Sequence, residues 1–184
     1  MKREQVSEYL KILDQSERKI LRELGVKFGR YHVFLYKLIK PEAVSLRILL
    51  WKNFNQKYFD LKPPQFGLNF LDNDKFKNKH FMLLCGFEKF DNFFVRIDIL
   101  ERLFVQIINS KDGNEIKLRP EMLNLLGCSK NNFRKLLTSM SYKVTERNDE
   151  LFFRYMPKKL SKKVSGRQKK KESPFGILKT LNLN

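Results

Sequence analysis

The sequence has little of what a disulfide-stabilised, zinc-binding or membrane-spanning protein needs. Only two of its 184 residues are cysteines. Cys85 and Cys128 stand far apart, without His or Cys neighbours at metal-ligand spacing, which disfavours both a disulfide framework and a zinc site. No apolar run approaches the roughly 20 residues that cross a bilayer. We therefore expect no metal, no cofactor and no membrane-spanning segment.

The motifs of common enzymes are also missing. The chain has no G-x-x-x-x-G-K-S/T phosphate-binding loop, and no G-x-G-x-x-G, H-E-x-x-H or G-x-S-x-G motif. Its acidic residues are scattered, without a convincing carboxylate pair. His32 and His80 have no nucleophile or metal ligand as a companion, so we interpret both as structural residues. The sequence predicts no catalytic residue.

What the chain has in excess is positive charge. It has 38 Lys and Arg against 20 Asp and Glu, which gives a net charge of +18 and a pI near 10.0. Such an imbalance predicts a polyanionic partner, with nucleic acid first and an anionic membrane surface second. Because 42% of the residues are hydrophobic and 17 are Phe, the chain can still bury cores.

The predicted fold class is α+β and mostly helical, in three parts. Residues 1–74 are predicted to form an N-terminal helical module with a linker loop. Residues 75–156 have the element order of a winged helix-turn-helix, and residues 157–184 are predicted to form a disordered basic tail.

In the first part, apolar residues recur at helical spacing over residues 4–13 and again after Asp14 or Ser16. Pro41 opens a third helix. Its predicted apolar face comprises Val44, Ile48, Leu49 and Trp51. Residues 26–40 fit a strand at first and either a strand or a helix at their end.

The segment from Asn55 to Asp74 is rich in Pro, Gly, Asn and Asp, and we interpret it as a long loop that ends at a boundary near Lys75. Residues 78–86 then fit a short helix, and residues 87–97 fit two short strands about Asp91 and Asn92.

Asp98 is predicted to cap the first helix of the winged helix-turn-helix, with Glu101 as its capping-box partner. The apolar face of this helix comprises Ile99, Leu100, Leu103, Phe104, Ile107 and Ile108. Residues 115–118 alternate as a short strand. Pro120 opens the second helix and Gly127 closes it.

Ser129 is the predicted N-cap of the third helix, so that only residues 127–129 separate the two helices, as in a helix-turn-helix. Phe133, Leu136, Leu137 and Met140 then fall on one apolar face. Two alternating strands around residues 147–150 follow as a hairpin, which would be the wing.

The polar face of the third helix is the surface that a recognition helix offers to nucleic acid. The candidate nucleic-acid-binding residues on this helix and the hairpin are Lys130, Asn131, Arg134, Lys135, Thr138, Lys143 and Arg147. Many winged helices bind only protein or pack inside a larger machine, so both alternatives remain open.

The third part has eight cations and Glu172 as its single acidic residue over residues 157–173. The cations are Lys158, Lys159, Lys162, Lys163, Arg167, Lys169, Lys170 and Lys171. A disordered tail of this sign is predicted to contact phosphates without reading sequence. The apolar end that follows, "SPFGILKTLNLN", could form a small docking helix.

Three stretches carry a resemblance to a known family. The first is "ERKILRELGVKFGRYHVFLYKLIKPEAVSLRILLW", Glu17 to Trp51. The second is "VRIDILERL" with "PEMLNLLGCS", and the third is the terminal "SPFGILKTL". Together they resemble the C-terminal region of alphaproteobacterial superfamily 2 DExH helicases, relatives of the mitochondrial degradosome RNA helicase. The segment from Asn55 to Lys79 has no counterpart in this pattern.

In that family these segments follow two RecA-like domains that hold the ATPase motifs, and such domains are absent from this sequence. The resemblance thus implies a non-catalytic accessory region that grips the strand along which the enzyme moves. The helicase core would come from another chain or from a missing part of a longer one.

We therefore expect a nucleic-acid-binding accessory module of an ATP-dependent helicase, with RNA favoured over DNA by the resemblance. The alternative is a structural or ribosome-associated RNA-binding protein. The stretch "MKREQVSEYLKILDQ" alternates charged and apolar residues, unlike a signal peptide, so a location in the cytoplasm or an organelle matrix is expected.

Overall fold

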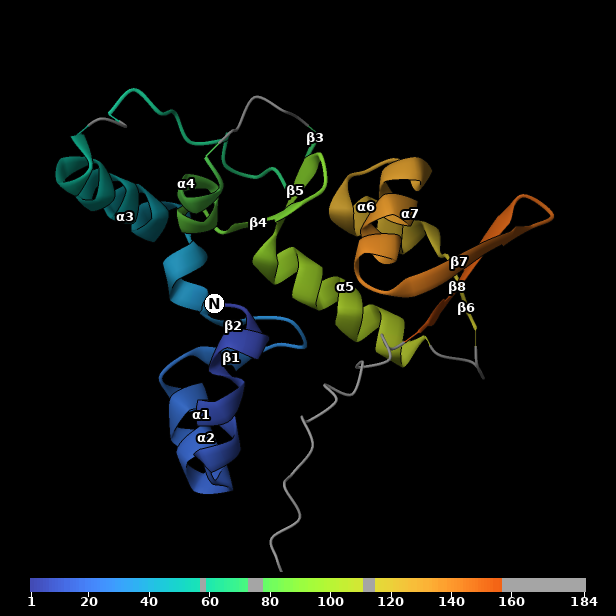
Figure 1. Ribbon diagram of the computed structural model, residues 1–184, viewed down its shortest axis with the longest axis horizontal. Coiled ribbons are helices and arrows are strands. Elements are labelled where there is room, and N and C mark those ends of the chain that lie inside the picture. The colour runs from blue at the N-terminus through green and yellow to red at the C-terminus, as the bar shows by residue number, and fades with distance from the viewer. Residues whose placement is uncertain (57–58, 73–77, 111–114, 157–184) are drawn as a thin grey trace, which may run out of the picture.

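The computed structural model describes residues 1–56, 59–72, 78–110 and 115–156 (Figure 1). Helices and antiparallel strands are interspersed along these residues, and the fold class is α+β, as predicted. The expected tail and the expected boundary at Lys75 both lie outside the described residues.

The first forty residues form short helices around one hairpin. The elements are η1 (Arg3–Val6), α1 (Ser7–Ile12), α2 (Gln15–Glu23), β1 (Val26–Phe28), β2 (Val33–Leu35) and η2 (Tyr36–Ile39). Asp14 caps α2 in a reciprocal capping box with Glu17, which confirms one of the two predicted starts. The ambiguous residues 26–40 are thus a hairpin followed by a 3-10 turn.

Helix α3 (Pro41–Phe54) begins at Pro41, as predicted. Val44 and Ile48 are buried, but Leu49 was wrongly assigned to the same face and is 55% exposed. The buried edge follows the i, i+4 spacing, and Leu49 is turned about 100° away from Ile48 at 3.6 residues per turn.

The second sheet contains the two strands predicted over residues 87–97 and a third strand where a loop was expected. Strand β3 (Phe70–Asp72) lies inside the predicted loop of residues 55–74 and pairs with β5 (Phe93–Arg96), whose other neighbour is β4 (Phe87–Phe90). Three residues are too few to reveal a strand by alternation, and the partner of β3 lies more than twenty residues on. Helix α4 (Lys79–Leu84) precedes β4, as predicted.

These elements share one core with α3. Its buried members are Val44, Ile48, Leu71, Phe81, Met82, Cys85, Phe87 and Phe94. The core therefore combines residues from both sides of the boundary that was predicted near Lys75.

The remaining elements surround a larger core. They are α5 (Ile97–Asn109), β6 (Ile116–Lys117), α6 (Pro120–Leu126), α7 (Lys130–Ser139), β7 (Tyr142–Arg147) and β8 (Glu150–Tyr155). The three strands form one antiparallel sheet in the order β6-β8-β7. Figure 1 shows α5 running from the end of β5, below α6 and α7, toward the β6-β8-β7 sheet.

The local signals of this region behave as predicted. Pro120 is the first residue of α6, and Gly127 ends that helix in the left-handed conformation, at φ 68°. The hydroxyl of Ser129 accepts a hydrogen bond from the Asn132 amide and caps α7. Of the predicted apolar face of α5, however, Ile108 is 53% exposed, because no described element covers that side of the last turn.

The start of α5 was predicted wrongly. Its N-cap is Arg96, whose guanidinium binds Asp98 at 2.7 Å, so Asp98 lies inside the helix. Glu101 closes no capping box. Its carboxylate accepts hydrogen bonds from the backbone amides of Arg30 at 2.6 Å, Tyr31 at 3.0 Å and His32 at 2.8 Å. Three converging donors from a distant turn outcompete the single amide of an N-cap.

The turn that supplies these amides fits tightly around the carboxylate. A Cβ atom on Gly29 would collide with Glu101, so a residue without a side chain is needed at this close approach. Nδ1 of His32 lies 3.1 Å from Glu101, and its Nε2 lies 3.4 Å from Glu88, which also pairs with Lys2 at 3.0 Å. His32 is thus a buried, partnered residue, as the interpretation of it as structural requires.

The two carboxylates tune the charge of this histidine. Burial alone lowers the pKa of His32, but hydrogen bonds to Glu101 and Glu88 outweigh burial and raise it above 6.5. Burial raises the pKa of Glu88, and its contacts with His32 and Lys2 overcome this and lower it below 4.5. Folding therefore shifts the protonation equilibrium of each residue toward its ionised form.

This network should make stability depend on pH in a defined direction. The stabilisation from protonated His32 is complete below its unfolded pKa of 6.5 and is lost as the pH rises through the folded value. The stabilisation from ionised Glu88 is fully present above its unfolded pKa of 4.5 and is lost as the pH falls through the lowered pKa of the folded state. The free energies of unfolding of the wild type and His32→Gln, measured with urea, should differ most between pH 4.5 and pH 6.5. A difference that stays constant up to about pH 9 would contradict the assignment.

Candidate nucleic-acid interface

Helix α7 presents the predicted polar face to solvent. Phe133, Leu136 and Leu137 are fully buried on its inner side, whereas Asn131, Arg134, Lys135 and Thr138 are exposed. The hydroxyl of Thr138 donates to the backbone carbonyl of Arg134 at 2.9 Å, so its hydrogen is used within the helix. The inner side anchors the helix and leaves Asn131, Arg134 and Lys135 as groups that can reach a ligand.

Acidic residues of the β7-β8 hairpin form ion pairs with two cations of this face. Glu146 lies 2.7 Å from Lys130 and 3.7 Å from Arg134. Lys130 also donates to the backbone carbonyl of Asp149 at 2.8 Å. The hydrogen bond to Glu146, followed by that to Asp149, raises the pKa of Lys130 despite some desolvation. A phosphate at the start of α7 must therefore compete with Glu146 for both cations.

The sheet separates the two hairpin residues from the α7 residues. Side chains alternate along β7, so Glu146 faces α7 while Lys143 and Arg147 face the other side. Arg147 binds Glu115 at 3.2 Å, and its guanidinium lies 5.9 Å from the ring centroid of Phe152. The candidate residues that the structure describes thus occupy two surfaces, not one.

The second surface contains residues that were not among the candidates. Phe152 and Arg154 of β8 and Lys117 of β6 lie on the same side of the sheet as Lys143 and Arg147. Alternation along β8 could have placed the first two, but the position of Lys117 depends on the register between β6 and β8, which the sequence does not reveal.

The predicted phosphate-contacting residues of the tail lie outside the described residues. They are Lys158, Lys159, Lys162, Lys163, Arg167, Lys169, Lys170 and Lys171.

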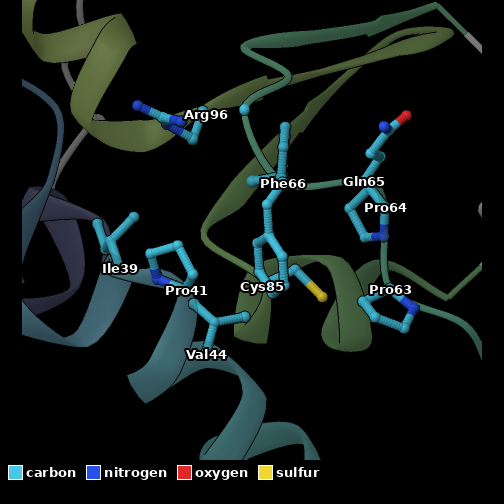
Figure 2. A pocket seen from close by; sticks show the side chains of 11 residues that line it. Ile39, Pro41, Val44, Pro63, Pro64, Gln65, Phe66, Cys85 and Arg96 are labelled. Carbon is cyan, nitrogen blue, oxygen red and sulfur yellow. The ribbon is translucent and has the colours of Figure 1, made fainter.

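A small cavity lies between α3 and the segment that precedes β3 (Figure 2). Its volume is about 50 Å³, far below the roughly 300 Å³ at which ligand pockets begin. Pro41 and Phe66 line it, together with Cys85, and Arg96 stands at its upper edge in Figure 2. Burial raises the pKa of Cys85 to about 12, so this thiol is not a nucleophile at neutral pH.

Among residues 1–56, 59–72, 78–110 and 115–156, no group of three His, Cys, Asp or Glu side chains is arranged to hold a metal ion. Over the same residues, no helix is both long enough and apolar enough to span a membrane.

No protein-family model, curated protein sequence or solved structure matches this chain.

Proposed function

We propose that this chain binds nucleic acid through a winged helix-turn-helix formed by residues 97–155. The order α5-β6-α6-α7-β7-β8 and the sheet order β6-β8-β7 support this assignment, because a short strand, a helix-turn-helix and a hairpin occur in the sequence expected of a winged helix. In this arrangement α7 is the recognition helix and the β7-β8 hairpin is the wing.

The observation that carries the proposal is the solvent-facing side of α7, where Arg134 and Lys135 stand exposed on a helix whose other side is fully buried. A ligand can therefore reach these cations without any loss of core packing. The net charge of +18 favours a polyanion and provides long-range attraction.

Within this proposal, the chain works as a non-catalytic accessory module of an ATP-dependent helicase, with RNA as the favoured ligand. The resemblance of residues 17–51 and of the "PEMLNLLGCS" stretch to DExH helicases supports this choice. A helicase core on another chain, or on a missing part of a longer one, would be the protein partner. The expected location is the cytoplasm, where such an enzyme meets its RNA.

The exposed apolar residues on the outer side of α3 support a role within a larger assembly. Leu46, Leu49, Leu50 and Phe54 are each more than half exposed, while Val44 and Ile48 are buried on the opposite side. A cluster of exposed large apolar side chains ordinarily marks a surface that another molecule covers. This exposure also suits the alternative, a structural RNA-binding protein of a ribonucleoprotein. Helicase motifs encoded directly upstream in the same reading frame would favour the helicase module, and an isolated gene would favour the alternative.

Removing two exposed cations from α7 should separate binding from stability. The double variant Arg134→Ala, Lys135→Ala is expected to keep the wild-type melting temperature, because exposed side chains contribute within about 0.5 kcal/mol each. Its affinity for nucleic acid should fall, and each lost phosphate contact should flatten the log-log salt dependence by about 0.7 on single strands or about 0.9 on duplex.

The matched control removes the same charge from the first part of the chain, at the exposed Lys11 and Lys19. The proposal requires a larger loss of affinity from the α7 pair than from this control pair in a titration at constant salt. Equal losses would assign binding to the general positive field and α7 to a scaffolding role.

A further inference from the structure

The solvent side of the β6-β8-β7 sheet carries an aromatic ring at the centre of a group of cations. Strand β8 is the middle strand, and its Leu151 and Phe153 point into the core. Phe152 therefore points outward, directly between Lys117 of β6 and Thr145 of β7. Figure 1 shows this sheet at the edge of the molecule.

Lys143 and Arg154 form a like-charge pair beside this ring. They are direct cross-strand partners on the outward side of the hairpin. Within the described residues, neither of them forms an ion pair with a carboxylate. Like charges directly opposite each other in a sheet are destabilising, and a phosphate placed over this pair would relieve the repulsion.

The other two cations are already in contact with carboxylates. Lys117 lies 2.5 Å from Glu150, and Arg147 lies 3.2 Å from Glu115. Arg147 at the same time covers part of the Phe152 ring. Because this guanidinium is planar, a flat ligand that stacks on the Phe152 ring can also contact the guanidinium.

A single aromatic residue on a sheet surface needs no ligand to explain it. The combination of features is harder to explain without a ligand. The ring is partly exposed, it lies on the central strand, and a cation pair without carboxylate partners adjoins it. Aromatic rings on sheet surfaces stack unpaired bases in several RNA-binding folds, with cations holding the backbone. Bases inside a duplex cannot reach such a ring.

We propose that this sheet face is a binding site for single-stranded nucleic acid, in which a base stacks on Phe152 and the adjoining phosphate lies over Lys143 and Arg154. The site rests on the proposed function in that its ligand is nucleic acid, but it is distinct from the α7 face, which lies on the other side of the hairpin. In this proposal single-stranded nucleic acid binds the sheet face, and duplex nucleic acid binds the α7 face.

The test compares a labelled single-stranded 12-nucleotide RNA with a 12-base-pair duplex, each titrated with the full chain at several salt concentrations. Phe152→Leu keeps an apolar side chain and should weaken single-strand binding by about tenfold without changing the salt slope. Lys143→Gln, Arg154→Gln should flatten the slope for the single strand by about 1.4, two contacts at about 0.7 each. Neither variant should change duplex affinity more than twofold or so.

The double variant Arg134→Gln, Lys135→Gln is the matched control, since it removes the same charge from the other surface. It should affect single-strand binding less than the sheet-face pair does. Phe152→Trp adds a positive readout. The fluorescence of the new indole should be quenched when the RNA strand is added, and this variant should bind the strand at least as tightly as the wild type. Melting temperatures verify that every variant is folded.

Wild-type affinity of Phe152→Leu for the single strand, or a larger single-strand loss from the α7 pair than from the sheet-face pair, would overturn the sheet site while leaving the proposed function in place. An unaltered chain that binds neither RNA would overturn the proposed function and the sheet site together.

Discussion

Replacing Glu101 with alanine is expected to lower the free energy of unfolding by about 3–5 kcal/mol. Its carboxylate is buried and accepts three backbone amides, from Arg30, Tyr31 and His32. Without it these donors are left unsatisfied, and the ring of His32 loses one of its two carboxylate partners. Urea unfolding measures the loss.

The control for this variant is Glu23→Ala, which removes an exposed carboxylate from the end of α2 and should change stability by no more than about 0.5 kcal/mol. Hydrogen exchange adds a local readout, because the amides of residues 30–32 should exchange faster in Glu101→Ala. Similar costs for the two variants would show that the turn is held by other contacts.

Phe133→Ala is expected to cost a comparable amount, about 3–5 kcal/mol, for a different reason. The ring is fully buried beneath α7 and meets Phe153 of β8 edge-on, at 6.1 Å between centroids. Its removal leaves a cavity between the helix and the sheet that rigid neighbours cannot fill.

Lys135→Ala is the paired control, two positions along the same helix but exposed, and should cost within about 0.5 kcal/mol. Thermal or urea unfolding distinguishes the two. A small cost for Phe133→Ala would mean that α7 is only loosely packed, and the helix could then not hold its outer cations in place.

The acidic residues of the hairpin pair with two of the three cations of α7. Glu146 is adjacent in sequence to basic or polar residues, yet it faces Lys130 and Arg134 across the fold. In the proposed binding mode a polyanion has to displace Glu146, which it would do through simultaneous contacts with several cations. Among the described residues no carboxylate contacts Lys135, so in the proposed binding mode it is the α7 cation that a phosphate would reach without displacing an ion pair.

Local signals made much of the fold predictable. The cap at Ser129, the helix start at Pro120 and the stop at Gly127 each depend on groups within four residues, and each lies where the sequence predicts it. The buried side of α7 follows from a 3.6-residue period in the same way. Such features are encoded by neighbouring residues, so they can be read without knowledge of the tertiary structure.

The errors arose where a local pattern and a distant partner competed. Asp98 and Glu101 have the spacing of a capping box, yet Glu101 binds a turn that lies about seventy residues earlier. Leu49 and Ile108 have helical spacing, but both are more than half exposed because none of the described elements covers them. Strand β3 exists because β5 offers it an edge.

By itself the sequence determined the order of helices and strands from α4 onward, the buried side of α7 and the strong positive charge, since each depends only on local spacing or composition. Tertiary structure alone decided that Glu101 clasps the turn before β2, that Glu146 neutralises part of α7, and that Lys117, Lys143 and Arg154 gather around Phe152. These three outcomes depend on strand register and on which distant groups satisfy a buried charge, and neither is encoded in the spacing of neighbouring residues.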